Sequence, residues 1–177
     1  MIYGERIRLR AVEREFLPLF VSWLNDPEVK AHLSIYLPFS QADEEGWYEN
    51  MLKSPAESRP LTIEARQGEG WKTIGNCGLH QPDHKNRSAE FGLVIGDKTF
   101  WNHGYGTETT RLMVSHGFNT LNLHRIFLRV FENNPPAIRV YEKAGFIHEG
   151  RMRQAEYRDG EYIDVLLMSI LRDEWRG

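Results

Sequence analysis

Two stretches of this chain decide its fold: Trp101-Asn102-His103-Gly104-Tyr105-Gly106-Thr107 and Asn134-Pro135-Pro136-Ala137-Ile138-Arg139-Val140-Tyr141-Glu142-Lys143-Ala144-Gly145-Phe146. In the first stretch, Gly104 and Gly106 stand where a strand should end and a helix should begin. Backbone N–H groups converge on an anion at such a place, beside the positive end of the helix. We therefore expect a pyrophosphate cradle formed by Trp101, Asn102, His103, Gly104, Tyr105, Gly106 and Thr107.

The second stretch predicts a short helix with clear boundaries. Asn134 suits the N-cap, Pro135 suits the first helical position, and Gly145 suits the left-handed residue beyond the end. A helix with both ends specified holds Tyr141 on a defined face. Asn134 either contacts the molecule bound at the cradle or only caps the helix.

Composition limits the class of protein. With 177 residues, 41% hydrophobic and 27% charged, residues 1–177 are expected to form one domain. A net charge of −3 argues against non-specific nucleic-acid binding, which needs clustered Lys and Arg. The first residues lack the apolar core of a signal peptide, and no apolar run reaches membrane-spanning length, so a cytoplasmic location without membrane contact is expected.

Short strands and helices alternate along the chain. Alternating apolar residues predict strands over 7–11, 61–65, 73–79, 89–95 and 126–131, the last one apolar on both faces like a central strand. Helical spacing predicts helices over 16–24 and 107–119 and a further helix that starts after Ser40 and carries Trp47, Tyr48, Met51 and Leu52 on one face. Asp159-Gly160 predicts a hairpin between 152–157 and 162–171. This order indicates an α+β fold with a mixed sheet and packed helices.

The chain resembles the GNAT superfamily of N-acetyltransferases. The resemblance rests on the two stretches above, on Gly4-Glu5-Arg6-Ile7-Arg8-Leu9-Arg10, on Asn86-Arg87-Ser88-Ala89-Glu90-Phe91-Gly92 and on the segment from Glu149 to Trp175. It is greatest to the branch with ribosomal-protein alanine and spermidine N-acetyltransferases, which often have Trp-Gly-Lys-Gly where this chain has Trp-Asn-His-Gly.

This resemblance implies a single GNAT-like domain whose central sheet is splayed at the cofactor site, with helices on both faces. It implies acetyl-CoA as acyl donor, with the pantetheine arm lying along the strand that contains residues 89–95. Relatives often dimerise, which leaves a homodimer open.

Amine acetylation sets two chemical requirements. The thioester carbonyl becomes an oxyanion, which backbone N–H groups at Gly92, Leu93, Val94 and Ile95 are placed to hold. An amine with a pKa of ~10.4 must also lose a proton at a cost of roughly 4.6 kcal/mol at neutral pH, whereas the thiol, with a pKa of ~8.5, needs less help. By resemblance, Glu90 is the base, directly or through water, and Tyr141 protonates the thiolate.

Each catalytic candidate has a structural alternative. Glu90 equally fits a strand-edge salt bridge, and Tyr141 fits a packing role. His80 and His84 flank Pro82, which indicates a loop rather than a helical metal site, so no metal is expected. Cys77 is expected to be a small core residue, and a single cysteine excludes an internal disulfide.

The amine acceptor is the open question. Segments 28–49 and 154–162 are expected to build its pocket, with acidic and aromatic residues that suit a cation: Glu28, Tyr36, Asp43, Glu44, Glu45, Trp47, Tyr48, Glu49, Glu156, Tyr157 and Glu161. A polyamine-like small molecule, a protein N-terminus and an amine-bearing antibiotic all fit. A catalytically silent acyl-CoA-binding or regulatory module is the alternative to an N-acetyltransferase.

Overall fold

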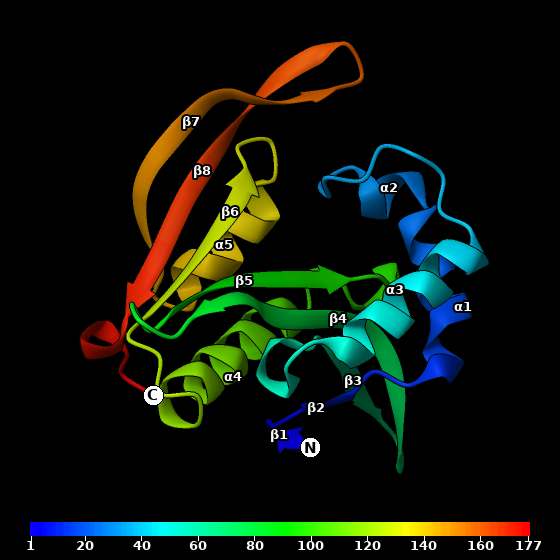
Figure 1. Ribbon diagram of the computed structural model, residues 1–177, viewed down its shortest axis with the longest axis horizontal. Helices are drawn as coiled ribbons and strands as arrows, with labels where there is room; N and C mark the ends of the chain where they lie inside the picture. The colour runs from blue at the N-terminus through cyan, green and yellow to red at the C-terminus, as the bar shows by residue number, and fades with distance from the viewer.

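One twisted sheet of eight strands organises the molecule, which is a computed structural model that describes residues 1–177 (Figure 1). The spatial order is β1-β2-β3-β4-β5-β6-β8-β7, and every neighbouring pair is antiparallel except β5 and β6. The strands are β1 Ile2–Tyr3, β2 Ile7–Ala11, β3 Leu61–Gln67, β4 Gly70–Asp83, β5 Ser88–Ile95, β6 Arg125–Phe131, β7 Ile147–Arg158 and β8 Glu161–Leu171.

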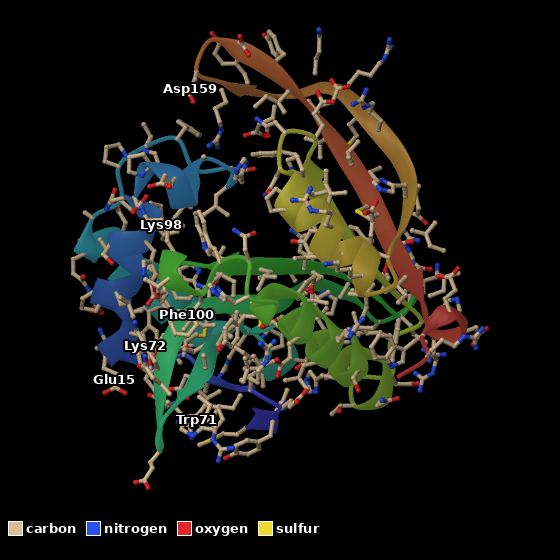
Figure 2. All side chains as sticks on the ribbon, turned by 180° about the vertical axis from the view of Figure 1, so that it is seen from behind. Glu15, Trp71, Lys72, Lys98, Phe100 and Asp159 are labelled. Atoms are coloured by element: carbon tan, nitrogen blue, oxygen red, sulfur yellow. The ribbon has the colours of Figure 1, made fainter.

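Helices lie on both faces of this sheet (Figures 1 and 2). On one face lie α4 (Tyr105–Asn119) and α5 (Pro135–Lys143), and on the other lie α1 (Leu17–Leu24), α2 (Pro27–Lys30) and α3 (Gln41–Lys53). Short 3-10 turns cover Arg14–Phe16, Ala56–Ser58, Lys98–Phe100 and Arg172–Glu174. The predicted α+β arrangement with a mixed sheet is confirmed.

The sheet splits between β5 and β6. These parallel strands pair only over Ser88–Glu90 and Arg125–Phe127, whereas β6 pairs with β8 along its whole length. From Phe91 to Ile95, β5 therefore has β4 as its sheet neighbour and no partner on the β6 side. The splayed sheet implied by the resemblance is present.

The core lies between the sheet and the pair α4 and α5. A cluster of 21 buried residues, which includes Ile63, Leu79, Phe118, Ile126 and Met168, fills this layer. A smaller cluster of five joins α1 to α3 on the other face. It contains Tyr48 and Met51 of the predicted apolar face, with Trp47 packed against it, whereas Leu52 is 42% exposed.

Local boundary signals are confirmed almost throughout. The side chain of Ser40 accepts a hydrogen bond from Asp43 N–H at 3.1 Å, and Asp43 accepts one from Ser40 N–H at 2.9 Å, which closes a capping box. Asp159 and Gly160 both have positive φ, 50° and 91°, as a tight hairpin turn requires. Gly145 is left-handed, with φ of 96°.

One prediction about the chain near His80 is wrong. Residues 80–83 were expected to form a loop because of Pro82 and Asp83, but β4 continues to Asp83 and pairs His80 with Glu90. A strand tolerates proline where the ladder is irregular, and the register shifts between His80 and Asp83. His80 therefore belongs to the sheet and not to a surface loop.

Candidate active site

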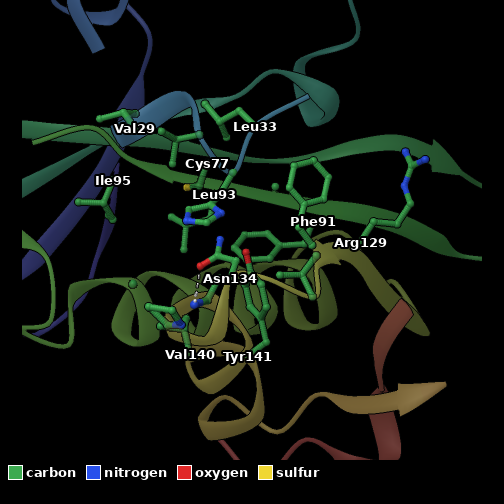
Figure 3. A pocket seen from close by; sticks show the side chains of 18 of the residues that line it. Val29, Leu33, Cys77, Phe91, Leu93, Ile95, Arg129, Asn134, Val140 and Tyr141 are labelled. Atoms are coloured by element: carbon green, nitrogen blue, oxygen red, sulfur yellow. Dashed lines mark hydrogen bonds between the residues drawn. The ribbon is translucent and has the colours of Figure 1, made fainter. Parts of the chain in front are cut away.

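A cavity of about 760 Å³ opens where β5 and β6 separate (Figure 3). One end of the cavity is lined by the free part of β5 and the start of α4. Residues of α5 form a side wall of the cavity. The other end is lined by α2, the residues that follow it, and the hairpin of β7 and β8. The splay of the sheet thus creates the cavity, and helix ends converge on it.

The predicted cradle lies at the first end. Gly104 is the residue before α4 and has φ of 86°, and Asn102 is also left-handed, with φ of 62°. The chain thereby turns so that the first N–H groups of a fifteen-residue helix, which have no partners inside the helix, lie at the cavity. A diphosphate fits such an end, because it accepts hydrogen bonds and is attracted by the helix dipole.

Arg6, which sequence reasoning did not select, fixes this loop from outside. Its Nη1 donates to the carbonyl of His103 at 3.0 Å, and its Nε donates to Glu108 at 2.9 Å. The guanidinium also lies 4.6 Å from the ring centre of Tyr105. The cradle is therefore held rigid by a residue of the N-terminal segment.

Most of the predicted cofactor residues line the cavity: Leu93, Val94, Ile95, Trp101, Asn102, Gly104, Tyr105, Gly106 and Asn134. His103 and Thr107 do not. The indole Nε1 of Trp101 donates to the carbonyl of Ile95 at 2.7 Å, which ties the loop to the end of β5. Asn134 accepts a hydrogen bond from Ala137 N–H at 3.2 Å, so it caps α5 and also borders the cavity.

Tyr141 enters the cavity wall from α5 (Figure 3). Its ring packs edge-on against Phe91, with ring centres 6.2 Å apart, and lies 6.0 Å from the ring of Phe146. Only 7% of the residue is exposed, and burial raises the pKa of the phenol to about 12. Tyr141 therefore keeps its proton throughout the neutral range, as a proton donor must.

Glu90 also borders the cavity, but it has a partner. Arg129 of β6 donates to its two oxygens at 2.7 and 3.0 Å, and this contact raises the pKa of the arginine. The salt bridge weighed as an alternative role for Glu90 is thus present. Period-two alternation was right that Glu90 lies on the face opposite the buried Phe91.

The far end of the cavity differs from expectation. Its lining comes from α2 and the residues after it and from the hairpin: Glu28, Val29, His32, Leu33, Ser34, Met152, Ala155 and Glu156. The α3 residues expected there do not reach it. Asp43 caps the helix, Glu45 and Glu49 pair with Arg14, and Glu44 is buried.

Arg158 joins the two walls of that end. From the hairpin, its Nη1 donates to the carbonyl of Lys30 at 2.6 Å and its Nη2 donates to the carbonyl of Leu33. The guanidinium lies 5.5 Å from the ring centre of Phe131. The segment after α2 is thereby fixed against the hairpin, although 125 residues separate Leu33 from Arg158.

Comparison with known proteins agrees with this geometry. A family profile described as Acetyltransferase (GNAT) domain matches residues 6–147. The chain belongs to the GNAT acetyltransferase family. An uncharacterized N-acetyltransferase p20 of Bacillus licheniformis is 31% identical over 178 residues, which cover 99% of this chain and 98% of that protein. A spermidine N(1)-acetyltransferase of Vibrio cholerae is 29% identical, covering 97% and 96%.

Solved structures of GNAT proteins share the whole fold. A spermidine N-acetyltransferase from Vibrio cholerae, in complex with CoA and spermine, has a TM-score of 0.88 at 27% identity and covers 97% of this chain and 98% of its own. This GNAT chain is accordingly an acetyl-CoA-dependent N-acetyltransferase. None of its helices combines the length and the apolar character of a membrane-spanning segment.

Proposed function

We propose that this enzyme acetylates the primary amine of a small, polyamine-like molecule or of a protein N-terminus. The observation that carries the proposal is the acceptor end of the cavity, where Glu28, Glu90 and Glu156 contribute carboxylates. Carboxylates at a cavity wall attract an ammonium group. The full-length similarity to spermidine acetyltransferases supports the same acceptor class.

The donor end is proposed to bind acetyl-CoA with its pyrophosphate at the start of α4 and its pantetheine arm along β5. We assign this role to Leu93, Val94, Ile95, Trp101, Asn102, His103, Gly104, Tyr105, Gly106, Thr107 and Asn134. For His103 and Thr107 the role is limited to their backbone, because their side chains do not line the cavity.

The reaction is proposed to be direct attack of the amine on the thioester. The amine nitrogen bonds to the carbonyl carbon, the oxyanion is held by N–H groups of the free β5 edge, and the C–S bond then breaks. Tyr141 gives its proton to the departing thiolate, and Glu90 supports removal of the amine proton. Residues 1–177 are proposed to act as one domain.

Two further proposals follow from the donor and from the resemblance. We place the enzyme in the cytoplasm, because acetyl-CoA is made and used inside the cell. We also propose a homodimer, since β7 is a sheet edge that exposes Ile147 and Met152. Light scattering on the purified protein measures its oligomeric state, and a monomer at all concentrations would contradict the proposed homodimer.

Release of free thiol from acetyl-CoA with a panel of amines tests the function. The panel contains spermidine, spermine, an aminoglycoside and peptides with free or blocked N-termini. Turnover with the polyamines or the free peptides supports the proposal and identifies the acceptor. Tight acetyl-CoA binding without thiol release from any amine would instead support the silent acyl-CoA-binding module.

A further inference from the structure

His80 lies in the cavity, on the strand next to the free edge of β5. It pairs directly with Glu90 across β4 and β5, as Gly78 pairs with Gly92. Directly opposed residues of antiparallel strands point to the same face, and alternate residues share it. His80, Glu90 and the two glycines therefore occupy one face, opposite the buried Leu79.

Because Gly78 and Gly92 have no side chains, they leave room for the imidazole ring of His80. A Cβ atom at Gly92 would lie 2.9 Å from Nε2 of His80, and one at Gly78 would lie 3.0 Å from Cε1. Any larger residue at either position would meet the ring. Nε2 thus lies close to Gly92, where β5 has left β6 and where the thioester is proposed to lie. The ring of His80 thus fills the space beside both glycines.

The charge state of this imidazole suits a proton acceptor. Loss of bulk water around the ring lowers the pKa of His80, and the nearby Glu90 carboxylate partly offsets this by raising it. The ring is neutral at pH 7 and remains open to the cavity. The other titratable or charged side chains that line the cavity are Glu28, His32, Cys77, Glu90, Tyr105, Arg129, Tyr141 and Glu156.

Both carboxylate oxygens of Glu90 already accept hydrogen bonds from the guanidinium of Arg129, which limits their contact with an incoming ammonium group. The neutral imidazole beside it has no such partner. Among the two groups on this face, His80 is therefore the better base. Glu90 remains a negative charge that favours the protonated ring.

We propose that His80 is the residue that takes the proton from the acceptor ammonium, with Glu90 acting through it. The proposal rests on the proposed amine acceptor. The ammonium gives one proton to Nε2, and the free amine forms the C–N bond. The C–S bond breaks, and the thiolate takes the phenol proton of Tyr141. The attacking nitrogen loses its second proton as the phenol is restored, and His80 releases the first to solvent.

The test compares His80→Gln and His80→Ala with a matched control, His84→Gln. His84 lies in the turn after β4, with its side chain 78% exposed. At pH 7 we expect both His80 variants to lose about 10²-fold in kcat/KM, within the usual range for general base catalysis, while acetyl-CoA affinity and the control are unchanged. The acid limb of the wild-type pH profile, set by a pKa below that of free histidine, should disappear in the variants.

Added imidazole distinguishes the loss of a catalytic base from a structural defect in the His80 variants. It should restore turnover in His80→Ala, where it can occupy the vacated space between the glycines, and not in Glu90→Gln. His80 variants with the parental kcat/KM and pH profile would overturn the proposal while leaving the acceptor class intact. Failure of the unmodified enzyme to turn over any amine would overturn the proposed function and the role of His80 with it.

Discussion

Arg129 on β6 donates two hydrogen bonds, of 2.7 and 3.0 Å, to Glu90 on β5 at the point where the two strands stop pairing. Glu90 is the last β5 residue in the ladder, opposite Phe127. Beyond it the strands part and the cavity begins. The ion pair therefore connects β5 and β6 at the point where they begin to separate. It also holds the Glu90 carboxylate beside the acceptor end of the cavity.

Glu90→Gln should lower turnover most at neutral pH and recover partly as rising pH deprotonates the amine unaided. The reason is that the charge of Glu90 supports proton removal, which costs the most while the amine is protonated. The measurement is kcat/KM from pH 6 to about 10. Glu149→Gln is the control, since Glu149 pairs in the same two-bond manner with Arg125 outside the cavity. A parallel drop at every pH would indicate a structural or substrate-binding carboxylate.

Tyr141→Phe should reduce turnover by about 10²-fold while leaving stability and acetyl-CoA affinity nearly unchanged. The substitution keeps the ring contacts with Phe91 and Phe146 and removes only the donated proton. Because the pKa of Tyr141 is raised to about 12, no loss of activity from its ionisation is expected below pH ~11.

Tyr162→Phe, an exposed tyrosine of the hairpin, is the matched control for Tyr141. Single-turnover kinetics are needed so that the chemical step is the one observed. If the Tyr141 variant transferred the acetyl group at the parental rate, Tyr141 would be a packing residue.

Gly106→Ala should weaken acetyl-CoA binding without unfolding the protein. A Cβ at this position would lie 3.4 Å from the side chain of Val140, which is ordinary contact, and alanine favours a helix over glycine. The added methyl group stands in the first turn of α4, where the pyrophosphate is proposed to approach. Calorimetric titration of acetyl-CoA measures the effect.

Gly46→Ala provides the comparison for that substitution. Gly46 lies within α3, away from the cavity, and its Cβ would meet open space. This variant should gain helix stability and keep its affinity. Equal affinity of the two variants for acetyl-CoA would contradict the proposal that the diphosphate binds at the start of α4.

Glu44→Gln should stabilise the protein at alkaline pH. Burial raises the pKa of Glu44 to about 7 from its ordinary value of 4.5. The folded state therefore prefers the neutral acid, so the parent loses stability as pH rises from the unfolded pKa through about 7. At pH 8.5 the variant should be more stable by at most ~3 kcal/mol, with little difference at pH 4.

Urea denaturation at the two pH values measures this difference. Glu45→Gln is the control, because Glu45 is paired with Arg14 near the surface and its removal should give no gain at either pH. A Glu44 variant that gains the same stability at pH 4 and pH 8.5 would show that the carboxylate charge is not the cause.

Local sequence determined where the elements begin, end and turn. The cap at Asn134, the left-handed Gly104 and Gly145 and the Asp159-Gly160 turn follow from sterics and hydrogen bonds within a few residues. The helix boundaries likewise put Tyr141 on an identifiable element, and the strand pattern did so for Glu90. These signals are short in range, so they can be read without knowing the partners.

Only the tertiary structure decided which groups meet. Arg129 contacts Glu90 across 39 residues, Arg6 fixes His103 across 97, and His80 faces Glu90 because β4 continues beyond Leu79 and pairs there with β5. Sheet register and helix packing set these pairs, and both depend on burial of the whole core rather than on neighbouring residues. The sequence therefore determined the helices and strands that carry the catalytic residues, while long-range packing determined which charged groups lie next to those residues.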